Sequence, residues 1–65
     1  MSNSDAIAYA QVALITLKKN NYKITLDNLY GAMNEMFDLF SEDSIHDELL
    51  CLTDYECWKA KHDIN

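Results

Sequence analysis

The apolar residues between Lys23 and Phe40 recur with the period of an α-helix, and no other feature of the chain restricts its fold as strongly. Intervals of three, four, three and four residues separate the members of this stripe, which are Leu26, Leu29, Met33, Met36 and Phe40. Such spacing places the side chains on one face of a helix. Thr25 precedes the stripe and suits the N-cap position, while Asp27 suits the positive end of the helix dipole. The pattern predicts a helix that begins after Thr25 and continues to about Phe40.

The residues before Asn20 predict an earlier helix with a second apolar stripe. The members of this stripe are Ile7, Ala10, Leu14 and Leu17. Ser2 or Ser4 can cap the N-terminus, and the helix should continue to about Lys19, where Asn20 or Asn21 can adopt the left-handed conformation that ends it. Because apolar residues occupy most of its circumference, we expect this helix to be covered on more than one side.

The last third of the chain carries several signals for the start of a helix. Either Ser41 or Ser44 can cap a helix over residues 42–51. A capping box of the form T-x-x-E begins at Thr53 and predicts a further helix over residues 54–62, with a kink between the two. The alternative is one continuous helix that tolerates Thr53 in its interior.

The scarcity of turn-forming residues argues against β-structure. The chain has no proline, and Gly31 is its only glycine. We therefore predict a single all-α domain over residues 1–65, a small bundle of three main helices with the last one kinked or split near Thr53. Gly31 lies inside a predicted helix, where it either allows another helix to approach closely or has no packing role. The expected core consists of Ile7, Ala10, Leu14, Leu17, Leu26, Leu29, Met33, Met36, Phe40, Leu49, Leu52 and Tyr55, with Ile45 and Trp58 beside them.

Negative charge is concentrated in the second half of the chain. Eleven acidic residues and five lysines give a net charge of −6, and there is no arginine. Eight acids and no lysine occupy residues 35–56, and these acids are Glu35, Asp38, Glu42, Asp43, Asp47, Glu48, Asp54 and Glu56. Because proteins contact phosphate backbones through clustered lysine and arginine, direct binding to nucleic acid is not expected.

The N-terminal segment does not have the order of a secretory signal. Asp5 stands where a signal has basic residues, and the lysines follow the apolar run instead of preceding it. Gln11 and Thr16 interrupt that run, which is also too short to cross a bilayer. We expect a soluble cytoplasmic protein without membrane contact, and cysteines that stay reduced in that compartment.

The histidines and cysteines do not have the spacing of a metal site. The four candidate ligands are His46, Cys51, Cys57 and His62. Ligands on one helix face stand three or four residues apart, whereas Cys51 and Cys57 are six apart. We therefore assign no metal ligand, and expect buried thiols that pack as small apolar groups. His46 should lie at the surface, flanked by Asp43 and Asp47.

Nothing in the sequence predicts catalysis. The chain has no glycine-rich phosphate loop, and "SEDSIHDE" lacks the turn glycine of a calcium loop. A helical chain of 65 residues also encloses little concave volume. We assign no catalytic and no cofactor-binding residue, and expect a protein that is not an enzyme and requires no cofactor.

The eight acids of residues 35–56 have two interpretations. They can be a solvated face that keeps an apolar bundle in solution. They can instead form a partner-binding surface that docks on a basic surface of another protein, such as a nucleic-acid-binding channel, where carboxylates take the places of phosphates.

The short acidic chain, with "DAIAYAQVAL" followed by "ITLDNLYGAMNEMFDLFSED", resembles the small helical proteins of phages and mobile elements of low-GC bacteria. Inhibitors of host defence, including anti-CRISPR proteins, belong to this group, and many are acidic and non-enzymatic. The resemblance implies an inhibitor that acts by occlusion, and it assigns no role to any residue.

Self-association is the alternative function. A domain of this length leaves much of its surface exposed and is only marginally stable without a staple. The nearly apolar first helix and the seven aromatic residues provide more apolar surface than three short helices can cover. Because two-fold symmetry is the commonest arrangement, we expect a homodimer whose contact surface is the first helix.

Overall fold

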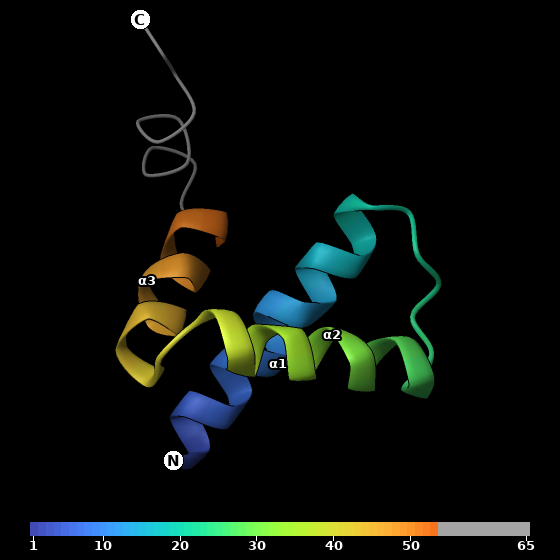
Figure 1. Ribbon diagram of the computed structural model, residues 1–65. Coiled ribbons are helices and arrows are strands. Elements are labelled where there is room, and N and C mark those ends of the chain that lie inside the picture. Colours follow the sequence, from blue (N-terminus) through green and yellow to red (C-terminus); the bar gives the residue numbers. More distant parts are fainter. Residues whose placement is uncertain (54–65) are drawn as a thin grey trace, which may run out of the picture.

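The computed structural model describes residues 1–53, which form three α-helices and no strand (Figure 1). The helices are α1 (Asn3–Lys19), α2 (Leu26–Leu39) and α3 (Glu42–Thr53). Both α2 and α3 pack against α1, which is the central helix of this arrangement. The predicted all-α bundle of three main helices is confirmed. Leu52 and Thr53, where a kink or split was predicted, are part of α3, and the predicted helix over 54–62 lies outside the described residues.

The first helix begins at a capping box formed by Ser2 and Asp5. The Ser2 Oγ accepts a hydrogen bond from the Asp5 N–H at 3.2 Å, and the Asp5 carboxylate accepts one from the Ser2 N–H at 3.1 Å. Ser2, rather than Ser4, is therefore the N-cap. At the other end Asn20 is the C-cap, and Asn21 has a φ of 61°, the left-handed conformation expected of one of these two residues.

Hydroxyl groups also begin the other two helices. The Thr25 Oγ1 accepts from the Asn28 N–H at 3.1 Å, as predicted. Ser41 and Ser44 bond reciprocally, because each hydroxyl oxygen accepts from the backbone N–H of the other, at 2.7 and 3.1 Å. Of the two predicted starts, Ser41 is therefore the one that precedes α3. This helix continues to Thr53 and not only to residue 51.

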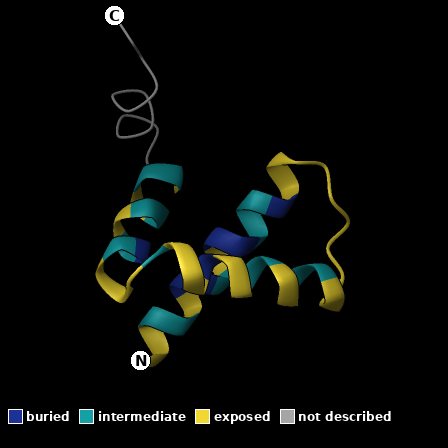
Figure 2. Cartoon of the chain, in the orientation of Figure 1, coloured by how far each residue is buried: buried dark blue, intermediate teal, exposed yellow. Residues whose placement is uncertain are grey.

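The core lies where α1 is covered by its two neighbours (Figure 2). The buried apolar residues are Ala8, Tyr9, Val12, Ala13, Leu17, Met36 and Ile45. Half-buried residues pack around them, and these are Leu29, Ala32, Met33, Phe40, Leu49 and Leu52. Most of the predicted core is therefore present. Ala10 and Leu14 are half-buried, and the predicted core residues Tyr55 and Trp58 lie outside the described residues.

Two predicted core residues are instead exposed. Ile7 is 58% exposed, because it shares the solvent face of α1 with Ser4, Gln11 and Lys18. Leu26 is 86% exposed. Leu26 is the first residue of α2, and the N-terminal end of this helix extends away from α1 in Figure 1. In α1 the buried face is formed by Ala8, Tyr9, Val12 and Ala13, and of the predicted stripe only Leu17 is buried. The stripe of α2 was recognised correctly, but its first member, Leu26, is not covered by a neighbouring helix.

Tyr9 lies at the centre of the contact between the helices. Its side chain is 3% exposed, and its ring lies 4.5 Å from that of Phe37 in a tilted arrangement. The Tyr9 hydroxyl donates a 2.6 Å hydrogen bond to the backbone carbonyl of Phe40, the residue that ends α2. Burial raises the pKa of Tyr9, and the negative charges of Glu42 and Asp5 add to this. The protonated hydroxyl thus ties α1 to the connection between α2 and α3.

Gly31 has no neighbour that requires a small residue. A Cβ atom added at this position would meet nothing within 4 Å beyond the adjoining backbone. The expectation that Gly31 allows another helix to approach closely is therefore wrong. The space beside it is open.

We predict that Tyr9→Phe destabilises the fold by about 1–3 kcal/mol, because the partly buried Phe40 carbonyl would lose its hydrogen-bond donor. Urea unfolding followed by circular dichroism measures the change. The matched control is Tyr30→Phe, since Tyr30 is 73% exposed and its hydroxyl is accessible to water. Equal stabilities for the two variants would contradict the role given to the Tyr9 hydroxyl.

Candidate functional site

The predicted acidic surface is divided between two helices. Glu35 and Asp38 lie on α2, whereas Glu42, Asp43, Asp47 and Glu48 lie on α3; the remaining two predicted members, Asp54 and Glu56, lie outside the described residues. All the described members are exposed except Glu48, which is half-buried. The six described members therefore form two short rows, one on α2 and one on α3.

The outer face of α3 carries the clearest acidic row. Asp43 and Asp47 are four residues apart and share one face of the helix, on the side away from the buried Ile45. Leu50 continues this face and is exposed. Glu42 lies on a different side, because its carboxylate is 3.8 Å from the α-amino group of Met1. Asp43 and Asp47 are thus the two acids of α3 that are most clearly available to a partner.

His46 lies at the surface as predicted, with its side chain 41% exposed, but it does not contact Asp43 or Asp47. Its side chain is turned toward α1, where the Nε2 atom lies 2.6 Å from the Asp5 Oδ1. The helical period explains the difference, because residue 46 projects toward the same side as Glu42, whereas Asp43 and Asp47 face outward. His46 is therefore a link between helices, in contact with an acid that is distant in sequence.

The Asp5 carboxylate joins the first turns of α1 and α3. Hydrogen bonding from His46 holds the pKa of Asp5 well below its usual range, and the backbone N–H of Ser2 contributes in the same direction. Its side chain is 17% exposed. Because an ionised carboxylate only accepts hydrogen bonds, the His46 ring nitrogen is the donor in this pair. No signal in the sequence predicted this contact, because Asp5 and His46 are distant in the chain.

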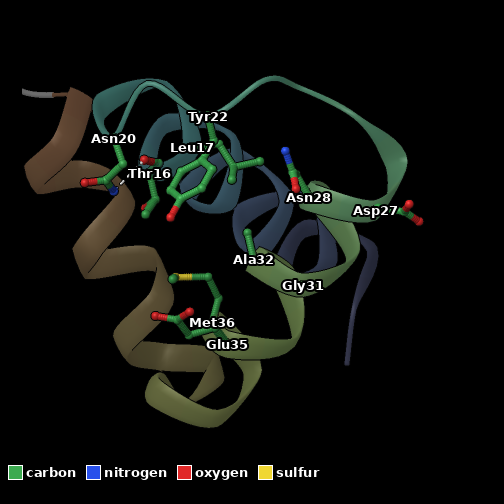
Figure 3. Close-up of a pocket in the computed structure, with 10 residues that line it drawn as sticks. All are labelled: Thr16, Leu17, Asn20, Tyr22, Asp27, Asn28, Gly31, Ala32, Glu35 and Met36. Carbon is green, nitrogen blue, oxygen red and sulfur yellow. Dashed lines mark hydrogen bonds between the residues drawn. The ribbon is translucent and has the colours of Figure 1, made fainter.

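A groove of about 610 Å³ lies at the other end of α1 (Figure 3). The last turns of α1 form one wall, and residues of α2 from Asp27 to Met36 form the other. Tyr22 enters the groove from the connection between these helices, opposite Met36 and Glu35, whereas the Asp27 carboxylate points away from it. The groove could not be recognised in the sequence, although the turn at Asn21 is a local signal for the position of Tyr22.

Other kinds of site have little support in the part of the chain that the structure describes. Within residues 1–53, no three side chains of His, Cys, Asp and Glu stand together as a metal ion requires. Cys51 is half-buried, and Cys57 and His62 lie outside this range. No helix among these residues combines the length and the hydropathy needed to cross a membrane.

Comparisons with protein-family models, with curated proteins and with solved structures found no match to this chain.

We predict that His46→Ala raises the pKa of the Asp5 carboxyl toward its ordinary value, because the variant removes the strongest hydrogen bond to the ionised form. The folded-state pKa of Asp5 is lower than its unfolded value of about 3.9. Its ionised form thus contributes stability above about pH 4, and this contribution is lost as the pH falls through the folded-state pKa.

Titration of the carboxyl carbon by nuclear magnetic resonance measures the pKa of Asp5 directly. The control is Asp47→Asn, which removes an acid next to His46 in sequence that faces away from Asp5. An Asp5 titration that is the same in the His46→Ala variant as in the unchanged protein would show that the pair does not hold the carboxylate.

Proposed function

We propose that this protein is a non-enzymatic interaction module that docks its acidic rows on a basic surface of a partner protein. The observation that carries the proposal is the exposure of acids on α2 and α3, in a stretch from Glu35 to Thr53 that contains no lysine. Asp43 and Asp47 face outward together, and Glu35 and Asp38 are exposed on the neighbouring helix. Carboxylates in helical rows can occupy positions that phosphates take on a basic surface.

The distribution of positive charge supports a directed interaction. Lys18, Lys19 and Lys23 are all exposed, at the C-terminal end of α1 and in the connection that follows. In Figure 1 this end of the molecule is well separated from α3. If the charges served solubility alone, the two signs could be interspersed. A separation of opposite charges orients the molecule as it approaches a charged partner and speeds association.

The partner that fits this chemistry is a cytoplasmic protein that binds nucleic acid through lysine and arginine. Occupying that surface would exclude the nucleic acid without any catalytic step. The resemblance to small acidic proteins of phages and mobile elements favours an inhibitor of host defence as the biological form of this activity. The chain itself is not expected to contact nucleic acid.

We predict that the partner is released by salt and by neutralising Asp43 and Asp47. Tagged protein captures the partner from a lysate of the source cells, and binding of the purified partner is then measured between about 50 and 500 mM salt. Affinity should fall across this range, because screening shortens the reach of exposed charges from about 14 Å to about 4 Å. The Asp43→Asn, Asp47→Asn double variant should bind more weakly by at least about tenfold at low salt, a loss typical of one or two charge pairs.

The matched control places the same change of net charge elsewhere. Ser4→Lys with Gln11→Lys also adds two positive charges, on the exposed solvent face of α1. We expect it to bind nearly as well as the unchanged protein. If the two double variants bind equally, or if salt has no effect, the acidic rows are only a solvated surface and the proposal is wrong.

Self-association remains a second candidate, although its surface differs from the one expected. The apolar side of α1 is covered by α2 and α3, and of its large apolar residues only Ile7 is exposed. An exposed apolar row lies instead on α2, where Leu26, Tyr30 and Phe37 are 86%, 73% and 41% exposed. Intervals of four and seven residues place them on one helix face. A second copy of this chain could cover that row.

We predict that, if a dimer forms, Leu26→Ser with Tyr30→Ser shifts it toward the monomer. Sedimentation equilibrium at micromolar to millimolar concentration measures the mass. Ile7→Ser is the control, because it removes an exposed apolar residue from a different helix. A monomer mass for the unchanged protein at every concentration would exclude self-association.

A further inference from the structure

The groove between α1 and α2 has features that the acidic rows do not require, and neither Asp43 nor Asp47 of α3 lines it. We propose that it anchors one arginine side chain of the basic partner. This inference rests on the proposed function, since it identifies a further feature of the same basic partner, which the groove would recognise.

The walls of the groove are held by side-chain and backbone hydrogen bonds. The Asn20 amide donates to the Thr16 carbonyl at 2.9 Å, and the Tyr22 N–H donates to the Leu17 carbonyl at the same distance. On the other side of the connection, the Asn28 amide donates to the Lys23 carbonyl at 2.8 Å. A site whose walls are already ordered loses less conformational entropy when it binds a ligand.

The interior of the groove suits the aliphatic part of a long side chain. Leu17 and Met36 line it, and both are buried apolar residues of the core. Beside them Gly31 leaves open space, because no atom beyond the adjoining backbone lies within 4 Å of the place where a Cβ would stand. Arginine can lay its methylene groups along such a surface while its charged end stays near water.

The polar groups of the groove favour a cation. Glu35 is exposed and contributes its carboxylate from α2. Among the described residues, no lysine lines the groove. Tyr22 is 61% exposed and presents an aromatic ring from the opposite wall (Figure 3). An aromatic ring and a carboxylate on facing walls are the groups that bind a guanidinium, the first by stacking and the second by paired hydrogen bonds.

Arginine fits this combination better than lysine. The guanidinium is planar, so it can stack on the Tyr22 ring while it donates two hydrogen bonds in its own plane to Glu35. It is also less strongly hydrated than an ammonium group, which lowers the cost of leaving water for a groove lined by Leu17 and Met36.

The test uses N-acetyl-arginine amide as the probe and the full chain labelled with ¹⁵N. The neutral isostere N-acetyl-citrulline amide controls for shape without charge. We expect the arginine probe to cause saturable shifts at the amides of Tyr22, Gly31 and Ala32, and the citrulline probe to cause none. Glu35→Gln should abolish the response, whereas Asp38→Asn, an exposed acid of the same helix that does not line the groove, should preserve it.

Gly31→Leu tests the shape of the groove separately from its charge. Leucine is a better helix former than glycine and enters open space, so the variant should fold at least as stably while its side chain blocks the probe. Circular dichroism and thermal unfolding establish that the fold is kept. Saturable shifts that persist in this folded variant would overturn the inference, as would equal responses to arginine and citrulline.

The test of the arginine groove can fail independently of the test of the acidic docking surface. If the arginine probe does not bind, but partner binding still depends on salt and on Asp43 and Asp47, the arginine groove is wrong and the acidic docking surface stands. If the probe binds the groove, but neutralising Asp43 and Asp47 leaves partner binding unchanged, the proposed use of the α3 row is wrong instead.

Discussion

The buried Tyr9 side chain is the contact on which the arrangement of the three helices depends. Its ring packs against Phe37 of α2, and its hydroxyl satisfies the carbonyl of Phe40 at the point where the chain leaves α2 for α3. An unpaired buried carbonyl would cost more than an ordinary hydrogen bond contributes. The contact therefore favours a single position of α2 across α1. It also favours a single position for the start of α3.

A second link follows from this placement, since α3 begins close to the first turn of α1. There the Asp5 carboxylate accepts a hydrogen bond from the Ser2 N–H and lies 2.6 Å from the His46 Nε2. The pair directs His46 and Glu42 toward α1, which leaves Asp43 and Asp47 on the outer face of α3. The contact between His46 and Asp5 thus determines which acids of α3 remain available to a partner.

The fold separates two surfaces of different chemistry. The outer row of α3 is charged and exposed, and it suits recognition by long-range attraction. The groove between α1 and α2 combines an apolar floor with Glu35 and Tyr22, and it suits one specific side chain. Sequence reasoning found the acids of the first surface, because composition reports charge directly. It could not find the second, because the groove joins Thr16 and Leu17 to Gly31 and Met36 across a connection whose path depends on packing.

The sequence by itself determined the elements that local interactions control. Thr25, Ser41 and the asparagines after Lys19 mark helix ends through hydrogen bonds to residues near them in the chain, and the apolar period identifies helices without knowledge of their neighbours. Only the tertiary structure decided which members of each stripe are buried. Tyr9 is covered while Ile7 and Leu26 are exposed, and His46 faces Asp5 instead of the acids beside it. Which residues are buried depends on where one helix crosses another. A helical period places residues on a common face, but it does not determine which helix packs against that face.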